Sequence, residues 1–311
     1  MRSLNTPTVG TQQTVYLKHG RQATVEVVGD GPPMFWFEGG PGLPARLSRP
    51  EAALLADSFS IYLIDPPGSG GSTPPADPSQ YDHIGHARFY DEVRRALGLP
   101  QVTIAGVSFG GTVALTYTSL YPEATVGCIA VSAFAVGTEV DDGATAAEME
   151  RMLSRHSDAA WYRTAKDVWD GWTQQVIDAD DPAQVDDMLR AVFPLYFAHP
   201  DRADVRALID WAKSAMRADL EAFKAWEAGL YQGIDIRPLL GTMPRPTLVV
   251  SGELDPICGP AQARQIAAAM PDAKLVIVPD CGHFPAWESP EKFRSIVLDW
   301  YNAPQATNRP S

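Results

Sequence analysis

Cysteine is scarce in this chain of 311 residues, which contains three copies. Cys128, Cys258 and Cys281 are odd in number and far apart, and no CxxC or zinc-type spacing occurs. This pattern predicts neither a disulfide framework nor a structural zinc site. It favours a reducing, cytoplasmic location.

The chain also has few positive charges: it contains 25 Lys and Arg residues and 38 Asp and Glu residues, which gives a formal net charge of −13. Nucleic acids and anionic membrane surfaces both attract Lys and Arg. The acidic balance therefore argues against either of them as a partner. It leaves a small molecule as the expected ligand.

Long apolar runs are missing as well. The longest, about Val126–Val136, falls far short of the ~20 residues that a membrane-spanning helix needs. The first residues, MRSLNTPTVGTQQT, lack the apolar region of a secretory signal. We therefore expect neither a membrane protein nor an exported one.

The rest of the composition is that of a soluble globular protein, with 45% hydrophobic and 20% charged residues. A chain of this length buries roughly 75% of its unfolded surface, so its core needs no cross-link. The length allows one large domain or two smaller ones.

Short apolar runs alternate with helical periodicity along much of the chain. The expected strands are Thr14–Lys18, Ala23–Val28, Met34–Phe37, Ile61–Ile64, Val102–Val107, Val126–Ser132, Pro246–Val250 and Lys274–Val278. The expected helices are Tyr81–Leu97, Ser108–Tyr121, Pro260–Met270 and Pro290–Tyr301. Strands that are apolar throughout suit a sheet buried on both faces, so the order predicts an α/β fold with a parallel sheet.

The alternation stops over residues 137–235, where no strand is expected and the helical pattern is broken at three prolines. This segment of 99 residues holds 20 acidic and 10 basic residues, so −10 of the net charge lies within it. It also holds five of the eight tryptophans, which suit the core of a small helical unit. The predicted organisation is a core made of residues 1–136 and 236–311, interrupted by a helical insertion at 137–235.

The sharpest motif is Gly106-Val107-Ser108-Phe109-Gly110, followed by Gly111. It lies where an expected strand meets an expected helix, which is the context of the G-x-S-x-G nucleophile elbow. Small neighbours leave room for the strained backbone that presents the Ser108 hydroxyl. The alternative is a plain helix start with Ser108 as its N-cap.

A serine hydroxyl needs a base, and in this type of site the base is a histidine late in the chain. Of the six histidines, only His283 lies on a loop after the last expected strand. His83 and His86 are three residues apart near a helix start, but no third ligand is nearby, so we expect a surface pair and no metal site.

The acid that orients the histidine is expected after the strand that ends at Val250. Asp255 lies in that loop, at the edge of a parallel sheet where catalytic groups gather. Glu253 in the same loop and Asp280 near the histidine are rivals, although Asp280 is too close to His283 in sequence to reach the far ring nitrogen comfortably.

Acyl transfer also needs donors for the oxyanion. The N–H of Phe109 follows the nucleophile, and a second donor is expected in the loop Glu38-Gly39-Gly40-Pro41-Gly42, where Gly40 is the preferred candidate. A plain turn is the alternative for these glycines. Neither a G-x-G-x-x-G motif nor a Walker lysine is present to bind phosphate.

With these residues identified, the chain resembles the α/β-hydrolase superfamily from about Thr14 to Tyr301, and more narrowly its proline iminopeptidase-related group. The resemblance rests on Gly39-Gly40-Pro41-Gly42, on the loop Asp65-x-x-Gly68-x-Gly70-x-Ser72 and on Gly106–Gly111. It implies a mostly parallel eight-stranded sheet flanked by helices, with a helical cap inserted after strand 6, and no cofactor.

The chain departs from the iminopeptidase pattern in two places. Members of the group often have His before the Gly-Gly-Pro-Gly run, where this chain has Glu38. Proline iminopeptidases usually have Trp after the nucleophile, where it has Phe109, and a glutamate-bearing cap motif that is not found here. The candidate substrate-binding residues are Glu38, Trp226 and Glu227, with Glu221 as a further acid on the same cap helix.

The leading hypothesis is a cofactor-free serine hydrolase that cleaves a small ester or lactone through an acyl-enzyme on Ser108. The alternative is an aminopeptidase, similar to proline iminopeptidase, that releases a small N-terminal residue. Hydrolysis of a C–C bond and a non-catalytic binding module are less favoured. The acidic insertion predicts neutral or cationic substrates, while the oligomeric state and the acyl and leaving groups stay open.

Overall fold

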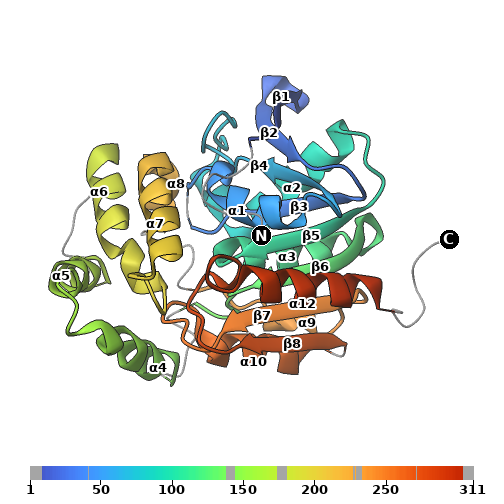
Figure 1. The fold of residues 1–311 in the computed structure, drawn as a ribbon. Coiled ribbons are helices and arrows are strands. Elements are labelled where there is room, and N and C mark those ends of the chain that lie inside the picture. The colour runs from blue at the N-terminus through green and yellow to red at the C-terminus, as the bar shows by residue number, and fades with distance from the viewer. Residues whose placement is uncertain are drawn as a thin grey trace.

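A single sheet of eight strands forms the centre of the computed structural model, which describes residues 9–40, 42–137, 144–173, 181–226, 228, 233–270 and 272–303 (Figure 1). The strands lie in the order β1-β2-β4-β3-β5-β6-β7-β8. Their bounds are β1 Thr11–Tyr16, β2 Gln22–Val28, β3 Pro33–Phe37, β4 Ser60–Ile64, β5 Val102–Val107, β6 Thr125–Val131, β7 Thr247–Gly252 and β8 Ala273–Val278. Strand β2 is antiparallel to both β1 and β4 and so runs opposite to the other seven strands, while all other pairings are parallel, which confirms the mostly parallel sheet.

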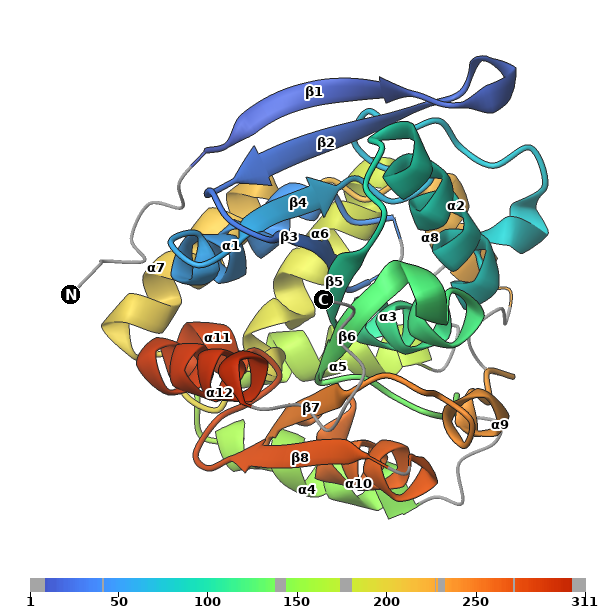
Figure 2. The same ribbon diagram turned by 90° about the vertical axis from the view of Figure 1, so that its right-hand side faces the viewer.

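Helices cover both faces of this sheet (Figure 2). One face carries α2 (His83–Ala96), α3 (Phe109–Leu120), α9 (Arg237–Leu240) and α10 (Gly259–Ala269), and the other carries α1 (Arg49–Leu55), α11 (Pro285–Glu288) and α12 (Pro290–Asn302). Strand β3 shows why both faces are apolar: Trp36 packs into the cluster under α12, while Phe35 and Phe37 pack into the cluster under α2 and α3. The predicted α/β architecture is confirmed.

The segment between β6 and β7 is helical, as expected. In its described residues, the helices that precede α9 are α4 (Ala144–Leu153), α5 (Tyr162–Thr173), α6 (Pro182–Val192), α7 (Ala203–Ala215) and α8 (Leu220–Ala225). Figure 1 shows α4 to α7 grouped beside the sheet. Asp181 caps α6 by accepting the N–H of Ala183 at 2.9 Å, so the break expected at Asp181-Pro182 is a helix start. A lone bridge between Val136 and Asp235 ties the ends of the insertion together.

Two differences concern element ends. The helix expected from Tyr81 begins at His83, because the Asp82 carboxylate accepts the Gly85 N–H at 2.6 Å and caps it there. The first strand extends back to Thr11, since Gln12 and Gln13 pair with β2 although both side chains face solvent. None of the helices in the described ranges has the length and apolar character required to cross a bilayer.

Glu51 on α1 is a buried carboxyl whose ionisation opposes folding. The residue is 2% exposed, and its Oε1 accepts the Trp287 Nε1–H at 2.7 Å. Its Oε2 is buried and makes no hydrogen bond within the described part of the chain. Burial raises the pKa of Glu51 to about 8, against the weaker lowering effect of its hydrogen bonds.

Replacing Glu51 by glutamine should therefore stabilise the protein in alkaline solution. The pKa of Glu51 is about 8 in the folded protein, against an ordinary value of 4.5. The wild-type protein therefore loses stability as the pH rises from about 4.5 to about 8. The stability advantage of the variant over the wild type should grow from near zero at about pH 4 to a maximum of about 5 kcal/mol above pH 8. Urea unfolding across this range measures it. The exposed Glu291→Gln serves as control, and equal pH dependence in both variants would contradict the assignment.

Candidate active site

Ser108 lies on a strained turn between β5 and α3, at the carboxyl end of the central strand β5. Its backbone has φ 55° and ψ −127°, a conformation that non-glycine residues rarely adopt. A Cβ at Gly106 would lie 2.3 Å from the Gly110 carbonyl oxygen, and one at Gly110 would lie 2.3 Å from that of Phe37. These close approaches explain why the turn needs glycine on both sides of the serine.

His283 and Asp255 meet in the structure. The Asp255 Oδ1 and His283 Nδ1 are 2.9 Å apart, and both side chains are fully buried. Asp255 follows β7 and His283 follows β8, so adjacent strands deliver the two groups to one edge of the sheet. With Nδ1 bonded to a carboxylate, Nε2 is left as the proton-accepting atom. That Nε2 is buried and has no hydrogen-bond partner within the described ranges.

The two rival acids are placed elsewhere. Asp280 pairs with His199, Oδ1 to Nε2 at 2.8 Å, and not with His283. Glu253 is exposed and accepts the Asp280 N–H at 3.2 Å. Asp255 is held by the backbone of its own loop, since Oδ1 also accepts the N–H groups of Ile257 at 2.8 Å and Cys258 at 3.3 Å.

Cys258 connects this acid to the serine. Burial raises the pKa of the Cys258 thiol well above its ordinary value and the charge of Asp255 raises it further, while a side-chain hydrogen bond to Ser108 lowers it. The thiol is therefore protonated and lies against the Ser108 side chain. Sequence reasoning missed this residue, because nothing in the chain's pattern signals a contact between two distant loops.

The loop that follows β3 and begins at Glu38 lies beside Ser108. Gly39 is so close to the serine that an added Cβ would lie 2.8 Å from the Ser108 Cβ. The Gly39 N–H donates to the Glu38 Oε1 at 2.9 Å, whereas the N–H of Gly40, at φ 83°, donates to no acceptor among the described residues. The Phe109 N–H begins α3 and is one of the donors that a helix leaves unpaired. These two N–H groups are the candidate oxyanion donors.

A family model for the alpha/beta hydrolase fold matches residues 32–290, which is more than four-fifths of the chain. The chain belongs to the α/β hydrolase family. Among curated relatives, the hydrolase is 25% identical over 264 residues to a 2-hydroxy-6-oxo-6-phenylhexa-2,4-dienoate hydrolase of Burkholderia cepacia, with 84% of each chain covered. It is also 25% identical over 288 residues to a probable proline iminopeptidase of Leptolyngbya boryana, with 82% of each covered.

Among solved structures, the hydrolase is similar to an alpha/beta fold family hydrolase from Bacillus anthracis. The TM-score is 0.74 at 18% sequence identity, and the match covers 94% of this chain and all of the other. This likeness supports the fold.

Glu38 supports the glycine loop of the hydrolase. Its two oxygens are taken by the protein itself, Oε1 by the Gly39 N–H and Oε2 by the Ser48 hydroxyl, and the residue is 7% exposed. Burial raises the pKa of Glu38 well above its ordinary value, and the charges of Glu51 and Asp65 add to the effect. A buried carboxyl group with both oxygens bonded inward is better placed to shape the loop than to bind substrate.

Of the residues in the insertion that were expected to bind substrate, the structure describes some and not others. Trp226 packs edge-on against Phe109, with ring centroids 5.1 Å apart, and against Phe134 at 6.4 Å. It therefore adjoins the residue that follows the nucleophile. Glu221 is exposed on α8, and Glu227 lies outside the described residues.

The expectation of a surface histidine pair on α2 is wrong. His86 is buried on the face of α2 that packs against α3, its ring 5.2 Å from that of Phe109, and burial lowers its pKa to about 4. His83 is bonded through Nδ1 to the Thr116 Oγ1 at 2.9 Å. Within the described ranges, no group of three His, Cys, Asp or Glu residues is arranged to hold a metal ion.

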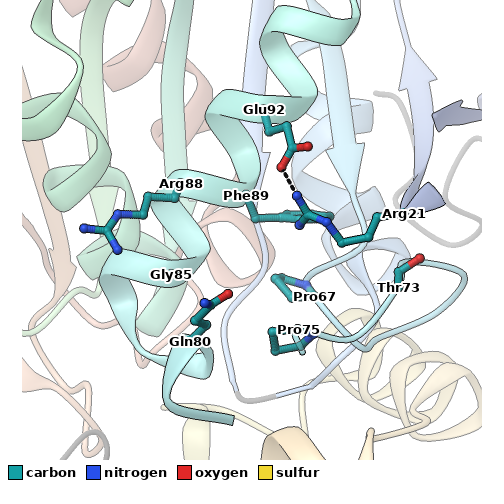
Figure 3. A pocket seen from close by; sticks show the side chains of 9 residues that line it. All are labelled: Arg21, Pro67, Thr73, Pro75, Gln80, Gly85, Arg88, Phe89 and Glu92. Atoms are coloured by element: carbon teal, nitrogen blue, oxygen red, sulfur yellow. Dashed lines mark hydrogen bonds and ion pairs between the residues drawn. The ribbon is translucent and has the colours of Figure 1, made fainter. Parts of the chain in front are cut away.

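A small surface pocket of about 140 Å³ lies outside this site, between the β1–β2 hairpin and α2 (Figure 3). Arg21 and Glu92 form an ion pair beside it, and Phe89 is among the residues that line it. None of Ser108, Asp255 or His283 lines it.

Proposed function

We propose that this protein is a cofactor-free serine hydrolase that cleaves a small carboxylic ester or lactone through an acyl-enzyme. The observation that carries the proposal is the buried Asp255–His283 pair at 2.9 Å. Ser108, on a strained strand-to-helix turn, follows β5 of the same parallel sheet and so lies at the same edge of the sheet as this pair. Ser108, Asp255 and His283 follow one another along the chain in the order of this type of triad.

In the first half-reaction, the Ser108 Oγ attacks the substrate carbonyl carbon and its proton passes to the His283 Nε2. Asp255 keeps Nδ1 protonated and stabilises the imidazolium that forms. The N–H groups of Gly40 and Phe109 donate to the oxyanion. Collapse of the tetrahedral intermediate breaks the bond to the leaving group, which takes the proton from His283 and departs as an alcohol.

In the second half-reaction, water attacks the acyl-enzyme. His283 accepts a proton from this water, and the same oxyanion donors stabilise the second tetrahedral intermediate. Collapse releases the carboxylic acid and returns the proton to Ser108. For a lactone the alcohol and the acid are parts of one product, so the bonds formed and broken are the same.

The insertion of residues 137–235 acts as a cap over this site in our proposal. His283 and Phe109 contact it directly, through the ring of Tyr196 at 5.3 Å and the ring of Trp226 at 5.1 Å. These aromatic side chains favour an apolar acyl or leaving group. The net charge of −10 in the insertion favours neutral or cationic substrates over anionic ones.

The second candidate is an aminopeptidase that releases a small N-terminal residue. The same acidic insertion favours it, because an acidic surface attracts a protonated amine, and one similar protein is named a probable proline iminopeptidase. We favour ester or lactone hydrolysis because Glu38, the acid nearest the glycine loop, is bonded inward to Ser48 and Gly39. Its carboxylate is therefore not offered to an ammonium group.

A panel of substrates distinguishes these functions. It would contain p-nitrophenyl butyrate, a γ-lactone, proline β-naphthylamide with its N-acetyl derivative, and a 2-hydroxy-6-oxo-dienoate as a C–C substrate. We expect kcat/KM for the ester or the lactone to exceed that for the prolyl amide at least about tenfold, or ~1.4 kcal/mol. Preference for the free-amine amide, abolished by N-acetylation, would establish the aminopeptidase. Preference for the dienoate would establish C–C hydrolysis.

A further inference from the structure

A buried carboxylate lies in α11, shortly after His283 in the chain. Glu288 is 3% exposed, and its Oε1 accepts the Gly282 N–H at 2.7 Å. Its Oε2 accepts the N–H groups of Ala198 at 2.9 Å and His199 at 3.2 Å. One carboxylate thus binds the residue before His283 and, with its other oxygen, a segment of the helical insertion.

The same two segments touch directly at the histidine. The His283 N–H donates to the Tyr196 carbonyl oxygen at 2.7 Å. A Cβ at Gly282 would lie 2.5 Å from that oxygen and 2.7 Å from the Ala198 nitrogen, so the backbones are in close contact. At the exposed rim, Asp280 pairs with His199 at 2.8 Å.

We propose that Glu288 is a positioning residue, which fixes the loop of His283 against the insertion and so holds Nε2 where it can take the serine proton. The proposal rests on the proposed role of His283 as the base. The Glu288 side chain accepts hydrogen bonds from backbone N–H groups both in the His283 loop and in the insertion, which an apolar residue of the same size could not do. The insertion would thereby act on catalysis as well as on substrate access.

The charge of Glu288 strengthens this bridge. Burial raises the pKa of Glu288 to about 7, while the three backbone N–H groups and the charge of His199 oppose the rise. The other titratable groups around it are Arg202, Asp280 and Cys281. Above pH 7 the carboxylate is ionised and accepts all three N–H groups. Protonation at lower pH places a hydrogen on an oxygen that already faces a donor, which weakens the bridge.

Glu288→Gln tests the proposal, because the amide places an NH₂ group opposite backbone N–H donors. We expect kcat to fall about 10- to 100-fold with KM changed less than about twofold, since displacement of the base slows the chemical step. The matched control is Glu291→Gln, on the exposed side of α12. Circular dichroism and the melting temperature establish that the compared proteins are folded.

The pH profile separates positioning from general destabilisation. In the unmodified protein, kcat/KM should fall by a step of about 10- to 100-fold as the pH drops through about 7, where Glu288 becomes protonated, and Glu288→Gln should lack this step. Equal kcat in Glu288→Gln and Glu291→Gln would overturn the proposal. If Glu288→Gln does not fold, the wild-type profile decides, because a kcat/KM that stays constant through about pH 7 contradicts the proposal. Should His283→Ala stay active, the proposed function itself fails.

Discussion

Replacing Ser108 by alanine is expected to lower kcat toward p-nitrophenyl esters by about 10⁴- to 10⁶-fold, with the fold and substrate binding retained. The loss is large because the acyl-enzyme cannot form without the hydroxyl, and water must then attack the substrate unaided by a covalent step. The oxyanion donors remain, so a residual rate above the uncatalysed reaction should persist. Steady-state kinetics at saturating ester measures the effect.

The control for this variant is Ser119→Ala, in the same helix α3 but near its far end. Its hydroxyl donates to the Leu239 carbonyl oxygen at 3.2 Å and lies far along the helix from the site. It should keep near wild-type kcat. Full turnover by Ser108→Ala, with binding intact, would refute the serine mechanism.

Removal of the Asp255 carboxylate is expected to give the second largest loss, about 10⁴-fold in kcat for Asp255→Ala. Asp255→Asn should lose less, about 10²-fold. The oxygen of the amide is held at the Oδ1 position by the N–H groups of Ile257 and Cys258, so it still accepts the Nδ1–H of His283. The substitution removes the negative charge that stabilises the His283 imidazolium. The hydrogen bond between residue 255 and His283 is kept, but it is no longer charge-assisted.

Glu253→Ala provides the comparison for these two variants, because Glu253 lies in the same loop and was the rival acid. It should keep near wild-type kcat, since its carboxylate is exposed and bonded to the Asp280 N–H. An Asp255→Ala variant as active as Glu253→Ala would remove Asp255 from the mechanism. If Asp255→Asn were as slow as Asp255→Ala, the amide must have flipped and reversed the histidine tautomer.

Much of the geometry of the candidate site could be predicted from the sequence because its parts have local causes. The serine turn needs Gly106 and Gly110 where a Cβ would clash, and this need is visible as a motif. His283 and Asp255 lie directly after strands that are apolar throughout or nearly so. The direction of parallel strands then brings them to one edge.

The contacts that escaped prediction join residues that are distant in sequence. The bridge from Glu288 to Ala198 and His199 depends on how the insertion packs against the last loops. The hydrogen bond between Cys258 and Ser108 likewise depends on the relative placement of two loops. The prediction that His86 is exposed was wrong for a related reason, because the burial of His86 depends on how α2 packs on α3. Periodicity within one segment carries no information about such contacts.

The most direct measurement of the central claim is the mass of the protein after reaction with a fluorophosphonate, followed by peptide mapping. The proposed mechanism predicts one adduct per chain, on Ser108, formed much more slowly in His283→Ala and absent in Ser108→Ala. Turnover of an ester by a protein that forms no adduct at Ser108, or an adduct formed equally fast in Ser108→Ala, would contradict it.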